Sequence, residues 1–294
     1  MRVLIGLFVL IFCVFGGFAA SGGHLAALFQ PYELIIIGGA AAGAFIISND
    51  GRVMKATFKT VSHIVKRPVV KREFNIQILS FFFQLLNKIR KDGMLSIEND
   101  IQNPKESALF NNYPLITSNE KLMEFICDHM QIITTGRVDP HHLDEIIDTD
   151  IETYEHETEL PINAINKVAD SLPAFGIVAA VMGVVHTMES MNQPPAILGG
   201  LVAGALVGTF LGVLLGYGIF SPMGIAMETR RVAMIKTLQV IKVLLLAAAN
   251  GMAPTIAVEL ARKLLYSDIR PNSVQLEEIV KQIKAGKVEE NVSA

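Results

Sequence analysis

Apolar and polar stretches alternate along the chain on a scale much longer than one helix turn. Four stretches hold no charged residue: 3–20, 34–48, 172–185 and 196–220. Crossing the hydrocarbon of a bilayer takes about 20 apolar residues in a helix, or fewer where flanking side chains reach the interface. The pattern therefore predicts four transmembrane helices. We place them at residues 1–20, 32–49, 169–188 and 197–221.

The segment between the second and third predicted spans, residues 50–168, is long enough to be a small helical domain. Apolar residues recur at spacings of three and four over 74–89, and the pattern resumes over 122–133 after Pro104 interrupts it. That spacing predicts two amphipathic helices. Gly136 is expected to end the second one.

Further polar helices are predicted before the third span and after the fourth. Residues 140–159 are rich in carboxylates and lack Lys and Arg, which predicts an acidic, solvated helix. Residues 222–294 are predicted to form C-terminal helices, the first ending at Gly251. Shorter helices are expected at 255–265 and 274–284, and the tail from residue 285 is predicted to be disordered.

The distribution of positive charge predicts how the chain crosses the membrane. The turns 21–31 and 189–195 contain no Lys or Arg, whereas basic residues follow the second and fourth spans: Arg52, Lys55, Lys59, Lys66, Arg67, Lys71, Arg72, Arg230, Arg231 and Lys236. Lys and Arg near span ends mark the cytoplasmic side. We therefore predict an all-α, polytopic inner-membrane protein whose termini and large helical domain are cytoplasmic.

The first apolar stretch has a second interpretation, as a cleavable signal peptide. A basic residue, Arg2, precedes an apolar core, and small residues follow it. However, one basic residue is few for such a segment, and the glycine pairs at 16–17 and 22–23 suit close helix packing equally well. We expect the segment to be retained. Cleavage would leave the topology of the remaining chain unchanged.

The motifs of common enzymes are absent from the sequence, which has no GxxxxGK[ST] phosphate loop and no HExxH. His141 and His142 are adjacent and so face different sides of a helix, and the acidic run lacks the spacing of a calcium loop. Cys13 lies in a span and Cys127 in the loop, so neither predicts a disulfide or a metal site. We expect no enzyme activity, metal, cofactor or nucleic-acid partner.

Ionisable residues avoid the interior of the predicted spans. Glu33 and His186 lie at outer ends, and Asp170 lies at an inner end. A proton path through lipid normally shows an ionisable side chain within a span, because a group must accept and release the ion. If this chain moves ions, a partner must supply the carboxylate that binds them.

Glycine recurs at every fourth position of the fourth span, at Gly200, Gly204, Gly208, Gly212 and Gly216. Small residues at i and i+4 let two helix backbones approach closely where lipid provides no hydrophobic drive. Each step overshoots a full turn by about 40°, so the stripe winds and can contact more than one neighbour. The third span offers matching small residues, Pro173, Gly176, Ala180 and Gly183. We therefore assign the glycines of both spans to helix packing.

Two runs around these spans are distinctive: DSLPAFGIVAAVMGVVH at 170–186 and GTFLGVLLGYGIFSP at 208–222. Further motifs extend over nearly the whole chain: FGG at 15–17, LFQPYELIII at 28–37, GMLSIENDIQNPKES at 93–107 and AVELARKLLYSDIRP at 257–271. Together they closely resemble the A subunit of the bacterial flagellar stator, the MotA family. The ExbB and TolQ energisers share the membrane core but lack this loop.

The resemblance implies an assembly and an ion path. In that family five copies of the A subunit surround two helices of a MotB-like B subunit, whose single membrane Asp carries the ion. Thr209 would offer a hydroxyl near that Asp, and Pro173 and Pro222 would shape the backbone at the inner mouth. The alternative for Thr209 is a helix–helix hydrogen bond, worth about 0.6 kcal/mol on average. Sodium-driven relatives tend to carry extra hydroxyls near Ala180 and Gly208, which favours H+ over Na+ here.

The resemblance also implies a rotor contact, because Arg90 and Glu98 match positions whose charges engage the rotor protein FliG. The residues alone would indicate a solvated helix end. Charged patches suit contacts that form and break quickly. The resemblance thus implies a pentameric stator subunit that forms a proton channel with a B subunit and turns ion flow into torque. An ExbB-like or TolQ-like energiser of an outer-membrane system and a scaffold without ion flow are the alternatives.

Overall fold

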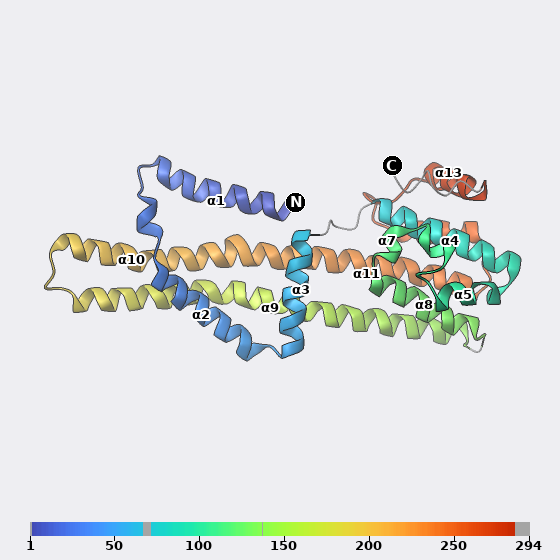
Figure 1. Ribbon diagram of the computed structural model, residues 1–294, viewed down its shortest axis with the longest axis horizontal. Coiled ribbons are helices and arrows are strands. Elements are labelled where there is room, and N and C mark those ends of the chain that lie inside the picture. The colour runs from blue at the N-terminus through green and yellow to red at the C-terminus, as the bar shows by residue number, and fades with distance from the viewer. Residues whose placement is uncertain (1, 67–71, 137, 286–294) are drawn as a thin grey trace. The chain divides into compact units, whose positions relative to one another are not determined.

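The computed structural model describes residues 2–66, 72–136 and 138–285, and every regular element in these ranges is a helix (Figure 1). The N-terminal elements are α1 (Arg2–Ala20), η1 (Leu25–Leu28), α2 (Pro31–Ser48) and α3 (Gly51–Lys66). The next are α4 (Arg72–Asp92), η2 (Met94–Ile97), α5 (Glu98–Gln102), α6 (Ala108–Asn111), α7 (Pro114–Thr117) and α8 (Glu120–Thr134). The last are α9 (Pro140–Glu189), α10 (Pro195–Val213), η3 (Leu214–Phe220), α11 (Ser221–Ala249), α12 (Pro254–Leu264) and α13 (Ser273–Lys284).

All four predicted spans fall on helices long and apolar enough to cross a membrane. The first two occupy Val3–Ala20 and Leu25–Ser48, and the other two lie within the longer helical runs Pro140–Glu189 and Pro195–Ala249. The acidic helix and the third span are therefore one continuous helix of 50 residues. The all-α membrane fold is confirmed. Of the predicted features, the basic residues Arg67 and Lys71 and the tail beyond residue 285 lie outside the described residues.

The helices predicted outside the spans are present with similar ends. The periodic stretches at 74–89 and 122–133 belong to α4 and α8. Gly136 and Gly251 follow α8 and α11 with φ angles of 64° and 61°. This left-handed conformation ends a helix and is easiest for glycine. Helix α3 and the short α6 and α7 were not predicted.

The chain divides into two compact units, each built from two separate stretches of sequence. The first comprises residues 1–68 and 156–231, and the second comprises 69–155 and 232–294. The predicted loop domain, 50–168, was separated from the C-terminal helices. The second unit combines residues 69–155 with residues 232–294, because the apolar side of α4 packs against α12 and α13.

The second unit has a core of large side chains. Three consecutive phenylalanines of α4, Phe81, Phe82 and Phe83, are at most 1 % exposed. Around them lie apolar residues of α8, of the 235–248 part of α11 and of α12. Burial of such area is the main source of stability for a unit in water.

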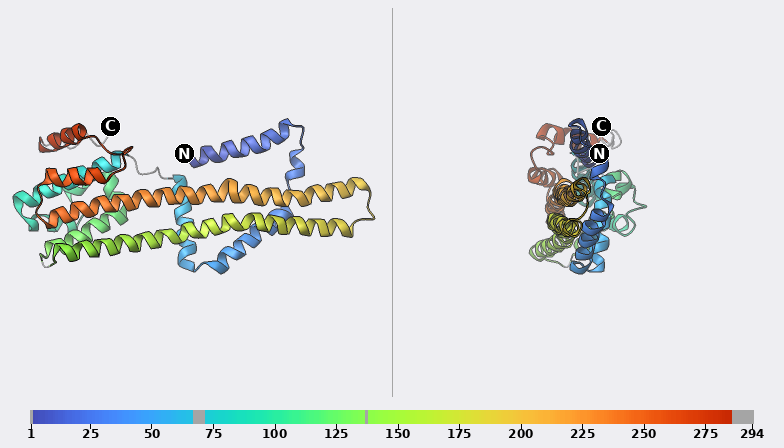
Figure 2. Two further views of the ribbon diagram at one scale, coloured as in Figure 1. Left: turned by 180° about the vertical axis from the view of Figure 1, so that it is seen from behind. Right: turned by 90° about the vertical axis from the view of Figure 1, so that its left-hand side faces the viewer.

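The first unit contains the candidate spans. Helices α9 and α10 run side by side in Figure 2, and α3 crosses α9 and the first part of α11. Helix α2 packs on α10 through Ile37 and Ala41, which are 0 % and 5 % exposed. No residue in the apolar window of α1 is buried by the rest of the chain. Lipid or further chains must therefore cover much of this unit.

Candidate functional site

Helices α9 and α10 are closest where both carry glycine. A β-carbon added at Gly212 would lie 2.7 Å from the carbonyl oxygen of Leu172 and 2.8 Å from the α-carbon of Gly176. One added at Gly176 would lie 2.9 Å from the carbonyl oxygen of Gly208. Carbon atoms do not approach backbone so closely, so a larger residue at either position would push the two helices apart.

We call the series Gly200, Gly204, Gly208, Gly212 and Gly216 the glycine ladder, and its members contact several neighbours. A β-carbon at Gly204 would lie 3.3 Å from the side-chain nitrogen of Gln30, and no atom lies within 4 Å of one at Gly200. On α9, a β-carbon at Gly183 would lie 2.6 Å from the β-carbon of Ala205. The winding stripe thus contacts α9 along most of its length, reaches the loop before α2 near its start, and is open at Gly200.

Pro173 lies inside α9 and alters its backbone hydrogen bonding. Proline has no N–H to donate, and its ring excludes the carbonyl four residues earlier, here that of Ala169. A β-carbon at Gly216 would lie 2.6 Å from this carbonyl oxygen and 3.0 Å from the Pro173 ring. Glycine at position 216 therefore leaves space for both the proline and the carbonyl group that it cannot hydrogen-bond.

A π-helical turn precedes the second predicted proline. The turn spans Leu214–Phe220, and Pro222 follows at the start of α11 with its side chain exposed. Pro222 cannot donate to the carbonyl of Gly218, and a π-helical turn accommodates such a missing bond. Both predicted prolines thus lie where a span departs from regular α-helical hydrogen bonding.

Thr209 is half-buried on α10 beside the close contact of the helices. A β-carbon at Gly176 would lie 3.4 Å from its α-carbon. Among the described residues, no partner forms a hydrogen bond with the Thr209 hydroxyl. Thr187 on α9 shows the usual alternative, since its hydroxyl donates to the carbonyl of Gly183 at 2.8 Å. A helix–helix hydrogen bond within the chain therefore does not account for Thr209.

The surfaces around Thr209 are apolar and largely uncovered in the single chain. Ala180 is half-buried, and its backbone nitrogen would lie 3.3 Å from a β-carbon at Gly208. Large side chains on α9 and α10 are exposed: Ile177, Val178, Val181, Met182, Val202, Leu206 and Val213. No carboxylate lies among them. The arrangement suits contact with an apolar helix that brings its own charged group.

The two predicted rotor-contact residues lie on the second unit, on opposite sides of a tight turn. Arg90 is exposed in the last turn of α4, and Glu98 is exposed at the start of α5. Gly93 forms the turn with a φ of 85°. An ion pair that no sequence pattern indicated joins the two sides of this turn, with Lys88 Nζ 2.6 Å from Asp100 Oδ2. The charges of Arg90 and Glu98 are thus displayed on a rigid support.

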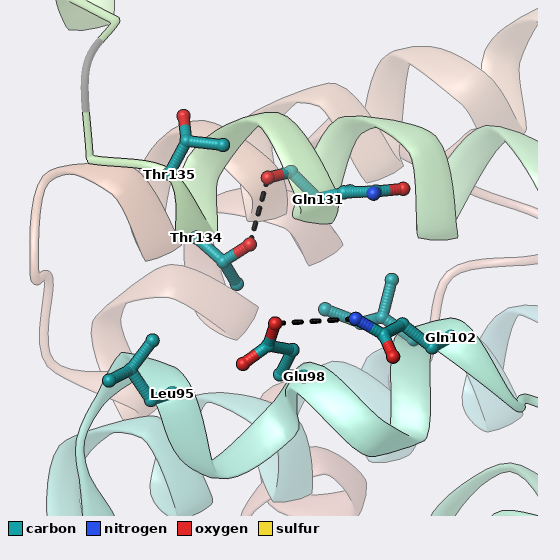
Figure 3. A pocket seen from close by; sticks show the side chains of 7 residues that line it. Leu95, Glu98, Gln102, Gln131, Thr134 and Thr135 are labelled. Atoms are coloured by element: carbon teal, nitrogen blue, oxygen red, sulfur yellow. Dashed lines mark hydrogen bonds between the residues drawn. The ribbon is translucent and has the colours of Figure 1, made fainter.

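Glu98 lines a small pocket between α5 and the end of α8 (Figure 3). The pocket has a volume of about 150 Å³. One Glu98 oxygen accepts a hydrogen bond from Gln102 Nε2 at 3.2 Å, and Thr134 donates to the carbonyl of Gln131 at 2.8 Å. The pocket is thus lined by the Glu98 carboxylate and other polar side chains together with the apolar Leu95 and Ile101.

The acidic part of α9 is largely exposed, as predicted, but some of its carboxylates have partners on other helices. Lys242 of α11 lies 2.7 Å from both Asp144 and Asp148, and its side chain is 16 % exposed. Buried His129 faces Asp150 at 3.7 Å and the carbonyl of Phe125 at 2.8 Å. No sequence pattern indicated these pairs, because their members are far apart along the chain.

The buried thiol of Cys127 is kept in its neutral form. Burial, with a smaller contribution from the charge of Asp128, raises the pKa of Cys127 to about 12, which leaves that thiol unreactive. The described residues contain no group of three His, Cys, Asp or Glu side chains placed to hold a metal ion. The features that stand out are thus the glycine contact, the two prolines, Thr209 and the charged turn.

Two sequence families match the chain. The family described as motility protein A N-terminal matches residues 4–93, and the MotA/TolQ/ExbB proton channel family matches residues 117–240. Motility protein A of Salmonella typhimurium is 45 % identical over 284 residues, covering 97 % of this chain and 96 % of that protein. Chemotaxis protein LafT of Vibrio parahaemolyticus is 33 % identical over 277 residues, covering 94 % and 97 %.

Solved structures share the fold. The MotAB structure from C. jejuni superposes with a TM-score of 0.77 at 19 % identity, covering 92 % of this chain and 98 % of that one. The flagellar MotAB stator complex from Bacillus subtilis gives a TM-score of 0.70 at 20 % identity, with coverages of 87 % and 92 %.

Proposed function

The chain belongs to the motility protein A family, a branch of the MotA/TolQ/ExbB proton channel family, and we propose that it is the A subunit of a flagellar stator. In this proposal five copies surround two helices of a MotB-like B subunit in the bacterial inner membrane. Both termini and residues 50–168 lie on the cytoplasmic side. The complex conducts protons and turns their flow into torque on the rotor.

The ion-path part of the proposal rests on one observation, which concerns the Thr209 hydroxyl. It has no hydrogen-bond partner among the described residues and lies on a surface of small and apolar side chains. A polar group left unpaired in a membrane span is costly, so it is expected to have a partner in the working complex. The membrane Asp of the B subunit is that partner, because the span interiors of this chain contain no Asp, Glu, His, Lys or Arg.

The two prolines and the ladder would let this site change shape. Each elementary charge that crosses 100 mV releases about 2.3 kcal/mol, which is enough to drive small steps of a ring. Protonation of the partner's Asp changes its fit against Thr209, and Pro173 and Pro222 shape the inner mouth. The ion is H+, because Ala180 and Gly208 offer no hydroxyl to coordinate a partly dehydrated Na+.

The turn that carries Arg90 and Glu98 would contact the rotor protein FliG. Support comes from its exposure and from the Lys88–Asp100 ion pair that holds it. Charges on a fixed turn can attract a partner without the apolar burial that would stall a rotating contact. The match of residues 4–93 to motility protein A favours this role over an ExbB-like energiser.

The test is a double charge reversal, Arg90→Glu with Glu98→Lys, made in cells whose swimming depends on this chain. We expect swimming to fail while membrane assembly with the B subunit is retained. Normal swimming in the variant, together with loss of transport of an outer-membrane substrate, would overturn the assignment in favour of an energiser. Lys121→Glu, on an exposed part of α8, is the control.

A second measurement identifies the ion. Swimming speed is recorded while the proton gradient and the sodium gradient are collapsed separately. The proposal predicts that speed follows the proton gradient. Dependence on sodium would refute proton coupling, and independence of both would leave only a scaffold role.

A further inference from the structure

Helix α3 has one face fixed against the first unit. Thr57 and Ile64 are 2 % and 4 % exposed, and Ile64 packs in a cluster with Ile162 and Ile165 of α9 and Met227 of α11. These contacts lie just beyond the inner ends of the third and fourth spans. They determine which side of α3 faces away from the protein.

Both ends of α3 are held by polar contacts. Asp50 accepts a hydrogen bond from the Val53 backbone at 2.8 Å at the N-terminal end. Arg230 of α11 donates to the carbonyls of His63 and Ile64 at 2.8 Å and 3.0 Å at the C-terminal end. The first contact caps α3 itself, whereas the Arg230 contacts attach its C-terminal end to α11 and oppose rolling of the helix.

The outer side is basic and carries one large aromatic ring. We call it the basic face of α3, formed by Arg52, Lys55, Phe58 and Lys59. The Arg52 side chain is 96 % exposed, and Phe58 is 68 % exposed. Asp50 lies 3.6 Å from Arg52, and within the described ranges neither lysine has a carboxylate partner. Three cations and an aromatic ring thus share one surface.

The position of α3 places this face along a membrane surface. The helix crosses α9 and α11 just beyond the ends of the third and fourth spans, as Figure 1 shows. Only two residues separate it from α2, where the exposed Ile47 marks the apolar end of the second span. A helix that crosses the spans at their ends lies in the interface, where Lys and Arg meet phosphates and aromatic rings meet the acyl boundary.

We propose that the basic face of α3 is a binding site for anionic phospholipid. Arg52, Lys55 and Lys59 contact the phosphate headgroups, and Phe58 enters the boundary of the acyl chains. Zwitterionic lipids carry no net charge, so the three cations select anionic ones. The site is independent of ion flow and rotor contact, and it would hold even if the proposed function failed.

The chain offers a clean experiment because it contains no tryptophan. Phe58→Trp introduces a single fluorophore into the full-length chain, which is reconstituted alone in phosphatidylcholine vesicles. Brominated phosphatidylglycerol or brominated phosphatidylcholine is added at equal mole fraction, and quenching is compared. We expect brominated phosphatidylglycerol to quench roughly twofold more strongly, because cations enrich anionic lipid locally. The excess should decrease at high salt, which screens exposed charges.

Two matched controls locate the effect. Phe29→Trp replaces a ring of similar exposure, 72 %, on a segment without Lys or Arg, and it should be quenched equally by both lipids. In the Phe58→Trp background, replacing Arg52, Lys55 and Lys59 by Gln should abolish the excess. Replacing the exposed Lys105, Lys121 and Lys263 by Gln should preserve it at the same change of net charge.

Equal quenching of the Phe58→Trp variant by the two lipids would overturn the proposal. The absence of quenching by either lipid would also overturn it and would assign this face to a protein partner. If the variant with the three Gln substitutions fails to reconstitute, the salt dependence of quenching in the Phe58→Trp variant tests the proposal instead. An excess that persists unchanged at high salt would exclude recognition by charge.

Discussion

The contact between α9 and α10 and the core of the second unit achieve close packing by opposite means. In the second unit, Phe81 meets the rings of Phe110 and Tyr113 at centroid distances of 4.7 Å and 5.7 Å. Between the spans, backbone meets backbone at Gly176 and Gly212. Burial of apolar area yields about 25 cal/mol per Å² in water, but lipid provides no such gain. Packing of spans therefore depends on small residues.

The largest effect is expected when a large side chain replaces a glycine at the contact between the spans. Gly212→Leu would drive a side chain into the backbone of Leu172 and Gly176, and we expect loss of the assembled complex and of swimming. Gly200→Leu adds the same side chain to the same ladder where no atom lies within 4 Å. The quantity of complex recovered from membranes measures both. Equal recovery of the two variants would contradict the packing argument.

The reverse change removes a large side chain from the second unit. Phe82→Ala should destabilise this unit by about 3–5 kcal/mol, since it leaves a cavity in a core where Phe82 is 0 % exposed. The measurement is hydrogen exchange of the α4 amides in the full chain. Leu95→Ala, at a residue 73 % exposed, should change the free energy of unfolding of this unit by less than about 0.5 kcal/mol. Similar exchange in both variants would show that the phenylalanine core is not what stabilises the unit.

The smallest effect concerns charge in the second unit. Hydrogen bonds from Arg262, at 2.6 Å and 2.8 Å, lower the pKa of Glu259 below its usual value of 4.5. Because the pKa is lower in the folded state, the ion pair stabilises α12 above pH 4.5, and this stabilisation is lost as the pH falls through the folded-state pKa. Glu259 is partly exposed, so the gain is at most about 1 kcal/mol.

Glu259→Gln should remove this part of the acid sensitivity of α12, measured by hydrogen exchange between about pH 6 and about pH 3.5, a range that spans the usual carboxyl pKa. Glu124→Gln removes a carboxylate of an exposed pair and serves as the control. An unchanged pH profile in the Glu259 variant would show that the Arg262 contact contributes nothing.

The two regions also differ in what the sequence could predict. The spans and the glycine ladder follow from composition and from a four-residue spacing, both of which are local along the chain. Helix α4 was predicted from its periodicity, but its packing on α12 was not, because these helices are far apart in sequence and the pattern identifies no partner. The same limit hid the pairs Lys88–Asp100 and Lys242–Asp144.

Around Thr209, sequence and structure contribute different parts. The sequence identified Thr209 as an isolated hydroxyl among apolar residues, and the resemblance suggested its role. The sequence could not indicate that this hydroxyl has no hydrogen-bond partner among the described residues, since most helical threonines donate to a backbone carbonyl. The sequence also could not indicate that the Ala169 carbonyl, which Pro173 cannot hydrogen-bond, faces Gly216. That contact depends on how α9 packs against η3.

The most direct test of the account is proton uptake by vesicles that contain this chain and its B-type partner, compared between Thr209→Val and Thr209→Ser. Valine preserves the shape of threonine without the hydroxyl, and serine preserves the hydroxyl. We predict that the valine variant assembles normally but conducts protons several-fold more slowly, while the serine variant conducts like the parent. Unchanged proton uptake in an assembled Thr209→Val complex would contradict the claim that this hydroxyl serves the ion path.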